Sequence, residues 1–168
     1  MIHVCHYNSP LGDLLLAAED EKLIGAWFES AKYYGSFLKS DRVTEEEDPA
    51  LVRACEWLDA YFRGMCPDPN ALPLCLKGST FRVSVLKVLL SIPYGGTTTY
   101  GAIANRLAAE TGKNVSAQAV GGAVGHNPIS VIIPCHRVLG ADGSLTGYAG
   151  GLDRKRRLLL HESGNSIL

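Results

Sequence analysis

The sequence predicts an α+β protein in two parts: a small α/β domain with a short antiparallel sheet over residues 1–76, and a mostly helical domain over residues 77–168. Short apolar runs separated by turn-forming residues begin the chain, which is typical of strands joined by hairpins. Three helical patterns follow one another in the second part, with a short turn before the third. This order indicates a helix-turn-helix of the winged-helix kind. Several prolines between 67 and 73 separate the two parts, because they cannot continue a helix.

Strands are expected at the beginning of the first domain. Residues 1–7 are mixed in character, while residues 14–18 and 23–28 are apolar, so we expect two or three short strands. Residues 8–12, Asn-Ser-Pro-Leu-Gly, have the chemistry of a turn. The side chains that could ligate Zn²⁺ in this part are His3, Cys5 and His6. No second pair stands at ligand spacing, so we favour a partly exposed edge strand over a metal site.

Residues 49–62 predict the helix of the first domain. The Asp48-Pro49 pair suits a helix start, because aspartate caps free backbone N–H groups and proline fits the first turn. The apolar residues that share one face at helical spacing are Leu51, Ala54, Cys55, Leu58 and Phe62. We expect this face, its cysteine included, to pack into the core.

Three helices are expected in the second domain, over residues 81–92, 100–109 and 117–125. A hydroxyl side chain that can cap the first turn precedes each of them: Ser79 or Thr80, Thr99, and Ser116. Pro93 and the glycines after it end the first helix. Residues 110–114 form the turn between the second helix and the third.

The third of these helices is built from small residues: Ala117, Ala119, Gly121, Gly122, Ala123 and Gly125. A glycine in a helix interior costs roughly 1 kcal/mol relative to alanine, so two adjacent glycines need a physical reason. Close approach of another backbone is that reason, and it has two forms. One is tight packing inside the domain, and the other is entry into a DNA minor groove. The spacing alone does not separate the two, and without a further motif we would favour packing.

Composition and charge narrow the class of protein. A chain with 46% hydrophobic and 20% charged residues is globular, and it has no apolar run long enough to span a membrane. Five cysteines and no secretion-type beginning lead us to expect free thiols in a reducing cytoplasm. Residues 1–76 hold 6 Lys/Arg and 13 Asp/Glu, whereas residues 77–168 hold 10 and 4. The basic half either meets a polyanion or complements the acidic half.

Residues 132–138, Ile-Ile-Pro-Cys-His-Arg-Val, are the most informative stretch. We expect an apolar strand to run into Pro134, followed by Cys135 beside His136 and Arg137. Thiolate is the nucleophilic form of cysteine, and neighbouring cationic or basic groups raise its fraction. Adjacent residues of an extended chain point apart, so a bridging water joins Cys135 to His136 more easily than a direct hydrogen bond. Taken alone, the pair also fits a buried, inert thiol.

Five segments extend this motif in order: Thr99-Tyr100-Gly101; Ala119-Val120-Gly121-Gly122-Ala123 with Asn127-Pro128; Pro134-Cys135-His136-Arg137; Gly147-Tyr148-Ala149-Gly150-Gly151-Leu152; and Leu160-His161-Glu162. Together they resemble the O6-alkylguanine-DNA alkyltransferases, also called methylated-DNA–protein-cysteine methyltransferases. The resemblance covers residues 79–163, and the ordered combination is highly specific. Residues 1–76 match only in size and style, as a variable α/β domain.

The resemblance implies a DNA-repair protein that transfers the alkyl group of O6-alkylguanine, or of O4-alkylthymine, to Cys135 and is consumed by the transfer. It implies that Glu162 orients His136, which takes the proton of Cys135 through a water. Tyr100 would donate a proton toward the departing guanine. Asn127 would organise its turn and hydrogen-bond near the thiolate. The displacement needs no cofactor and no metal.

The resemblance also implies that the lesion is flipped out of the base stack, with the protein in the minor groove. The residues implied to contact DNA or the flipped base are Ser116, Gln118, Ala119, Gly122, Arg137, Tyr148, Gly150 and Gly151. The family often has an arginine where this chain has Gln118, so we expect Gln118 to fill the gap with less electrostatic help. The expected partner is double-stranded DNA carrying O6-alkylguanine, bound by a monomer away from membranes.

Three other functions compete with this interpretation. A lesion sensor of the same fold would bind alkylated DNA without transfer, but such proteins lack the cysteine that stands at Cys135. A cysteine hydrolase would leave the helix-turn-helix unexplained, and the sequence offers no oxyanion-hole signature. A zinc nucleobase deaminase needs a Pro-Cys-x-x-Cys pair, and Val138 occupies the position of the second cysteine.

Overall fold

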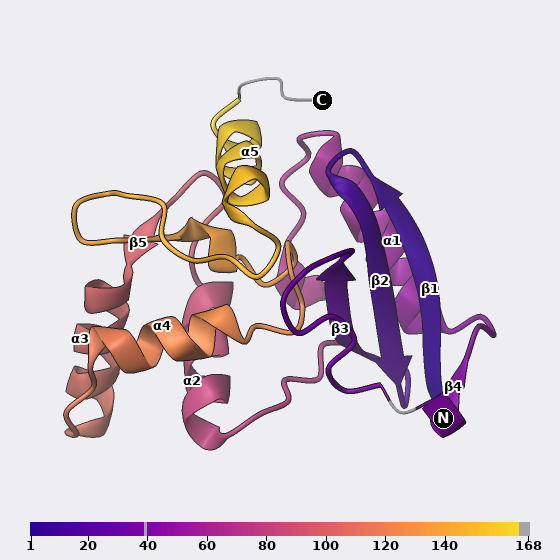
Figure 1. Ribbon diagram of the computed structural model, residues 1–168, viewed down its shortest axis with the longest axis horizontal. Coiled ribbons are helices and arrows are strands. Elements are labelled where there is room, and N and C mark those ends of the chain that lie inside the picture. Colours follow the sequence, from indigo (N-terminus) through magenta and orange to yellow (C-terminus); the bar gives the residue numbers. More distant parts are fainter. Residues whose placement is uncertain (39, 165–168) are drawn as a thin grey trace.

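The structure is a computed structural model that describes residues 1–38 and 40–164, with a sheet at one side and a group of helices at the other (Figure 1). The strands are β1 (Ile2–Ser9), β2 (Gly12–Glu19), β3 (Lys22–Phe28), β4 (Val43–Thr44), β5 (Thr98–Thr99) and β6 (Val138–Leu139). The α-helices are α1 (Pro49–Phe62), α2 (Thr80–Leu90), α3 (Tyr100–Thr111), α4 (Ala117–Gly125) and α5 (Leu152–Glu162). Short 3-10 turns are η1 (Ser40–Arg42), η2 (Pro69–Ala71) and η3 (Cys135–Arg137). None of the described helices is long and apolar enough to cross a membrane.

The first three strands form the antiparallel hairpins that the apolar runs predict. The sheet order is β3-β2-β1-β4, with Val4 of β1 opposite Ala17 of β2. Residues 10–11 link β1 to β2, inside the predicted turn. Asp20 and Glu21 link β2 to β3 with φ angles of 51° and 58°, the left-handed pair that a tight two-residue hairpin turn requires. The short β4 adds to the other side of β1 in parallel.

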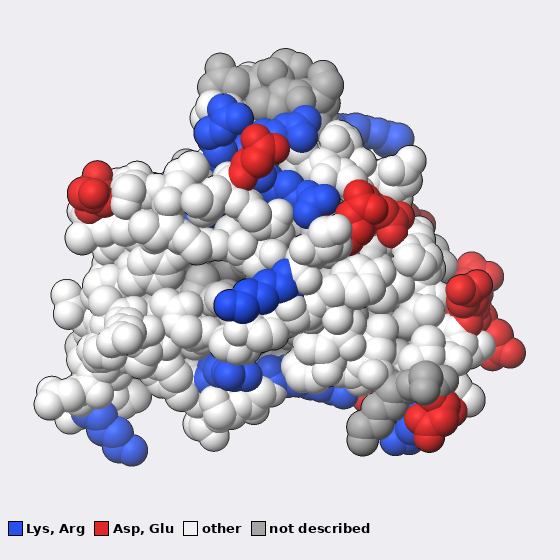
Figure 2. All heavy atoms as spheres, viewed as in Figure 1, with Lys and Arg blue, Asp and Glu red and all other residues white. Residues whose placement is uncertain are grey.

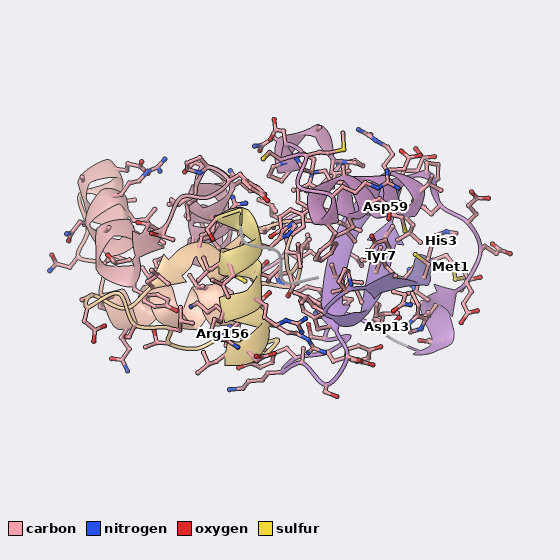
Figure 3. The ribbon with its side chains drawn as sticks, turned by 90° about the horizontal axis from the view of Figure 1, so that it is seen from above. Met1, His3, Tyr7, Asp13, Asp59 and Arg156 are labelled. Atoms are coloured by element: carbon pink, nitrogen blue, oxygen red, sulfur yellow. The ribbon has the colours of Figure 1, made fainter. Side chains whose placement is uncertain are left out.

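The helix predicted over residues 49–62 is α1, which packs on one face of the sheet (Figure 3). Its start is as expected, because the Asp48 carboxylate accepts the Ala50 N–H at 2.8 Å and Pro49 follows the cap. Four residues of the predicted apolar face are buried: Leu51, Ala54, Leu58 and Phe62. Trp57 and Tyr61 are buried as well, so the contact of α1 with the core is wider than the sequence predicted.

The polar side chains of β1 are occupied by neighbouring elements. Tyr7 donates a hydrogen bond to Asp59 of α1 at 2.7 Å, and both side chains are labelled in Figure 3. His6 Nδ1 lies 2.6 Å from the carboxylate of Asp13 on β2. Within the described residues, no three His, Cys, Asp or Glu side chains gather to hold a metal.

The three helices expected in the second part begin directly after their predicted capping residues. Of the two candidate caps of α2, Ser79 is used, and its hydroxyl accepts a first-turn N–H at 3.2 Å. This helix ends at Leu90, two residues before the predicted end. In contrast, α3 continues to Thr111, past its predicted end at residue 109, because Gly112 can take the left-handed φ of 69° that ends it. The third helix, α4, begins and ends as predicted and completes the helix-turn-helix.

The strand predicted before Pro134 is wrong. Residues 128–134 form consecutive buried turns, in which Ile132 donates to the Ser130 carbonyl at 2.8 Å and Ile133 donates to the Ile129 carbonyl at 3.1 Å. A short apolar run indicates burial without fixing the backbone conformation, because both a buried strand and a buried turn satisfy it. The chain then enters η3, which carries the Cys-His-Arg motif.

The two parts of the chain share backbone hydrogen bonds and a core. The edge of β3 accepts the segment before the motif: Ala26 donates to the Pro128 carbonyl at 2.8 Å, and Ser130 donates to the Ala26 carbonyl at 2.9 Å. One hydrophobic cluster contains residues of the sheet, of α1 and of α2 to α5. The Cys-His-Arg motif is therefore held in place by both parts of the chain. The boundary between residues 76 and 77 stays a prediction.

Candidate active site

Cys135 lies at the first position of η3, beneath the surface and 4% exposed. Pro134 precedes it and ends the buried turns, and the Cys135 N–H donates to the Ile133 carbonyl at 2.8 Å. The thiol is therefore fixed by its backbone and by the apolar core around it. Because the Cys135 sulfur does not project into solvent, a group that reacts with it must enter the protein to reach it.

The surroundings of the thiol keep it protonated at rest. Burial raises the pKa of Cys135 above the ordinary value of 9.0. The Asn127 side chain, the charge of Lys155 and the backbone N–H groups of residues 135 and 136 oppose that rise. These groups favour the thiolate once a proton acceptor removes the proton.

Asn127 holds the turn beneath the cysteine, as expected. Its amide nitrogen donates to the Ile133 carbonyl at 2.9 Å and to the Ile129 carbonyl at 3.3 Å, while its oxygen accepts the Ile129 N–H at 3.0 Å. The side chain is buried, and it opposes the rise that burial causes in the pKa of Cys135. One amide group thus joins the turn that precedes the motif to the thiol itself.

Glu162 at the end of α5 is the centre of a buried polar network. One carboxylate oxygen accepts hydrogen bonds from His136 Nε2 at 2.5 Å and from the Tyr61 hydroxyl at 2.6 Å. The other accepts from Arg137 Nε at 2.7 Å and from the Gly95 N–H at 3.4 Å. Burial alone raises the pKa of Glu162, but the bonds from His136 and Arg137 outweigh it and hold that pKa well below 4.5.

The contact with Glu162 determines the proton state of His136. Because Nε2 donates to a carboxylate, the neutral ring carries its proton there and presents a bare Nδ1. Nδ1 is buried and has no hydrogen-bond partner among the described residues. Burial lowers the pKa of His136 below 6.5, so the ring is neutral at pH 7. His136 is therefore a proton acceptor one residue away from the thiol.

Arg137 does not lie where a DNA contact requires it, and the expectation for this residue is corrected. Its side chain is 7% exposed, and Nε donates to Glu162 while Nη1 donates to the Ile92 carbonyl at 2.6 Å. Arg137 lies in η3, and its side chain is turned inward. Arg137 compensates the buried charge of Glu162 rather than that of a phosphate.

Two members of the site were missed in the sequence. Tyr61 reaches Glu162 from α1, 101 residues away in the chain. Lys155 is fully buried and donates from Nζ to the carbonyls of Val138, Thr146 and Gly147 at 2.6, 3.0 and 3.2 Å. A signal existed for Lys155, because it shares the face of α5 that carries Leu158 and Glu162 at helical spacing.

The segment 146–151 covers the thiol from the other side. Tyr100 donates from its hydroxyl to the Thr146 carbonyl at 2.8 Å, and burial raises its pKa above 10.0. The hydroxyl of Tyr148 is buried, with Ser130 and Cys135 among its neighbours. Gly150 has no room for a side chain, since a Cβ would lie 3.0 Å from the Phe28 ring. Gly151 takes a φ of 93° at the start of α5.

One side of the helix α4 carries exposed small residues, while Ala123 packs into the core. Ser116 caps it by accepting the Ala119 N–H at 3.0 Å. Gln118, Ala119 and Gly122 are exposed. A Cβ on Gly122 would meet nothing within 4 Å, so packing inside the protein does not explain this glycine. This observation favours the other interpretation of the small residues, the close approach of an external ligand.

A cavity of about 230 Å³ lies between α4 and the segment 146–151. Its walls include Tyr100 and Tyr148, the outward glycines of α4, and two residues of the first part of the chain, Lys32 and Tyr33. Tyr100 and Tyr148 lie close enough to Cys135 for a thiolate there to raise the pKa of each phenol. The cavity therefore shares two of its wall residues with the surroundings of the thiol.

Comparison with known proteins assigns the chain to a family. Residues 80–164 match the family described as 6-O-methylguanine DNA methyltransferase, DNA binding domain, and residues 2–76 match its ribonuclease-like domain. The chain belongs to the 6-O-methylguanine DNA methyltransferase family. Cys135 is the single cysteine within the segment that matches the DNA-binding domain.

Curated relatives of the family agree over nearly the whole chain. The methylated-DNA–protein-cysteine methyltransferase of Mycobacterium tuberculosis (strain ATCC 25618 / H37Rv) is 44% identical over 160 residues, which are 95% of this chain and 91% of the relative. The protein of the same name in Haemophilus influenzae is 37% identical, over 94% of this chain and 84% of the relative. The crystal structure of Mycobacterium tuberculosis OGT in complex with DNA superimposes with a TM-score of 0.83 at 40% identity, over 96% of this chain and 93% of that one.

Membership in the 6-O-methylguanine DNA methyltransferase family decides between the competing functions. The chain is a protein-cysteine methyltransferase of DNA repair, as the resemblance predicted, and the lesion-sensor alternative is not supported. The hydrolase and deaminase alternatives find no counterpart in the relatives described above.

Proposed function

We propose that Cys135 accepts the alkyl group of O6-alkylguanine in double-stranded DNA and keeps it as a thioether. The observation that carries this proposal is the placement of the one cysteine in residues 80–164 beside a buried, neutral histidine that is oriented by a carboxylate. A thiol with a raised pKa reacts only when a base takes its proton, and His136 Nδ1 is an acceptor next to it.

The proton leaves Cys135 through one water to His136 Nδ1, while Nε2 stays bonded to Glu162. The carboxylate stabilises the imidazolium that forms, as it does in other histidine-carboxylate pairs. The new thiolate is stabilised by Asn127 and by the backbone N–H groups at its own turn. Apart from the bridging water, each group needed for deprotonation thus lies on the chain itself.

The thiolate then attacks the alkyl carbon in line with the C–O6 bond of the base. The S–C bond forms, the C–O6 bond breaks, and its electron pair stays on guanine, which takes up a proton as it leaves. Tyr100 supplies the hydrogen-bond donor for that step, since its raised pKa keeps the phenol protonated. Its hydroxyl turns from the Thr146 carbonyl to the base to do so.

The alkylated base reaches the thiol by leaving the duplex. We propose that α4 enters the minor groove with Ala119 and Gly122 against the backbone, because neither side chain obstructs a close approach. Gln118 is exposed on the same face and fills the gap left by the extruded nucleotide. Tyr148 lines the cavity, and it walls the pocket that receives the alkyl group together with Gly150 and Gly151, which follow it in the chain.

No cofactor or metal takes part in this displacement as we propose it. We further propose that the protein acts as a monomer in the cytoplasm. All five cysteines are free thiols, which a reducing compartment would preserve. Sedimentation of the protein alone and with an equimolar duplex tests the monomer proposal, which a dimer in either sample would contradict.

Intact-protein mass spectrometry tests the proposed acceptor. After incubation with a duplex carrying one O6-methylguanine, the protein gains the mass of one methyl group in place of one hydrogen. Cys135→Ser abolishes the gain, and Cys66→Ser leaves it unchanged, because Cys66 is exposed and lies outside the site. A gain that survives in Cys135→Ser would overturn the assignment of Cys135, and no gain in the unaltered protein would overturn the function.

A further inference from the structure

The cavity next to the thiol has a wall that comes from the first part of the chain. After β3 ends, residues 29–38 leave the sheet and turn toward α4 and the segment 146–151. The Lys32 N–H donates to the Ala149 carbonyl at 2.9 Å. The Tyr33 ring stacks on His126, at the end of α4, with centroids 4.2 Å apart and planes at 27°. The two residues are thus attached to both sides of the cavity.

The conformation of Tyr33 indicates that the position is held in place. Its φ of 66° is in the left-handed region, which is unfavourable for a bulky side chain. Such a residue persists where its surroundings impose it, and strained positions of this kind gather at functional sites. The ring is nevertheless 39% exposed, so burial of apolar surface is not what fixes it.

Lys32 brings a positive charge to the same wall. Its ammonium lies 5.4 Å from the centroid of the Tyr33 ring, and no carboxylate pairs with it among the described residues. Figure 2 shows a basic side chain crossing the middle of this face beside a hollow next to α4, with the acidic side chains lying away from the hollow. An exposed cation and an aromatic surface at the entrance suit a phosphate and the sugar or base attached to it.

We propose that Lys32 and Tyr33 bind the sugar–phosphate backbone of the extruded nucleotide, so that the first part of the chain supplies one wall of the nucleotide-binding site. This inference rests on the proposed function. A nucleotide that reaches Cys135 between α4 and the segment 146–151 brings its two flanking phosphates to the mouth of the cavity. Lys32 pairs there with one phosphate, and the Tyr33–His126 stack supports the sugar. The match to the DNA-binding domain begins at residue 80 and does not include this wall.

The test compares a substrate that has a backbone with one that has none. The transfer rate is measured on a duplex carrying O6-methylguanine and on the free O6-methylguanine base in excess. Lys32→Gln removes the charge, and Tyr33→Asn removes the ring while keeping a residue that tolerates a left-handed φ. We expect either change to slow transfer from the duplex about 3- to 10-fold, as the loss of one phosphate or stacking contact does. Transfer from the free base changes less than about twofold, because this substrate has no backbone to bind.

The salt dependence identifies the phosphate contact, and Lys22→Gln is the matched control. Lys22 is an exposed lysine at the opposite end of β3 from residue 28. The plot of log rate against log salt concentration, measured with subsaturating duplex, has a negative slope. Its magnitude becomes smaller by about 0.9 for Lys32→Gln and stays unchanged for Lys22→Gln. An unchanged slope and rate in Lys32→Gln would overturn the role of Lys32. Equal slowing of both substrates would show that the wall only supports the fold. If the unaltered protein transfers from neither substrate, the proposed function fails instead.

Discussion

At the scale of single residues, the site depends on one buried carboxylate that binds a neutral imidazole, a guanidinium and a phenol. Glu162 orients His136, compensates Arg137 and accepts the Tyr61 hydroxyl. A buried charge of this kind is costly unless every partner is present. The network is therefore both a stability element and the device that presents His136 Nδ1 to the cysteine.

We expect Glu162→Gln to reduce the free energy of unfolding by about 3–5 kcal/mol, because Arg137 is left buried without its counter-charge. The same change removes the group that fixes the His136 proton on Nε2, so the transfer rate falls as well. Urea denaturation and the rate on methylated duplex check the two effects. Glu110→Gln breaks the exposed pair with Arg106 and costs less than about 0.5 kcal/mol. Equal costs for the two variants would contradict the account.

The fall of the transfer rate at acidic pH also depends on a single residue, His136. The neutral form of His136 is the base, and burial lowers its pKa, so the ring stays competent as the pH falls through 6.5. The rate of transfer from free O6-methylguanine is expected to hold through pH 6.5 and to fall only below it. Rates measured between pH 5 and 8 on the free base exclude effects on DNA binding. A half-maximal rate at or above pH 6.5 would contradict the depressed pKa.

At the scale of elements, α5 buries a charged side chain, whereas α4 exposes small residues. The exposed side of α5 carries Arg156, labelled in Figure 3, while its inner side carries Lys155. The outer side of α4 carries no large residue between Gln118 and Gly122. One helix therefore fixes the loop over the thiol, and the other leaves room for a ligand.

Lys155→Met is expected to lower the free energy of unfolding by about 1–3 kcal/mol, because the buried carbonyl of Val138 loses its donor. It also loosens the segment over the cysteine, so amide hydrogen exchange at residues 146–151 becomes faster. The control Arg156→Met removes an exposed charge on the same helix and changes stability by less than about 0.5 kcal/mol. Unaltered exchange in Lys155→Met would contradict the role of Lys155.

Two substitutions of Gly122 are expected to separate its effect on stability from its effect on DNA binding. Gly122→Ala adds a methyl group where nothing lies within 4 Å, so the fold is stabilised by up to about 1 kcal/mol. Gly122→Leu keeps helix propensity but places a bulky side chain on the outer face, and it weakens duplex binding more than 10-fold. Thermal unfolding and fluorescence anisotropy with a methylated duplex separate the two effects. Wild-type affinity in Gly122→Leu would place the duplex elsewhere.

At the scale of the whole molecule, local signals predicted more than distant contacts did. The starts of the helices over residues 49–62 and 117–125 could be predicted from a capping residue and the first turn, because these depend on adjacent residues alone. The strand expected before Pro134 was wrong, because burial was visible in the sequence and the turn was not. The contact of Tyr61 with Glu162 spans 101 residues, and nothing local in either segment points to the other.

The two parts of the chain also cooperate in ways that the sequence did not show. The first part was given no site residue by the resemblance. In the structure it supplies Tyr61 to the glutamate, the β3 edge to the turns before the motif, and Lys32 and Tyr33 to the cavity. The resemblance identified the motif residues, since their order along the chain was enough, whereas the supporting groups emerged only from the fold.

The most direct test of the account follows the methyl group itself. The protein is incubated with a duplex whose O6-methylguanine carries a deuterated methyl group, digested, and sequenced by tandem mass spectrometry. We predict the labelled methyl on the sulfur of Cys135 alone, with one label per protein molecule however long the incubation lasts. Label on another cysteine, or release of labelled methanol with Cys135 unmodified, would contradict the claim that this thiol is the permanent acceptor.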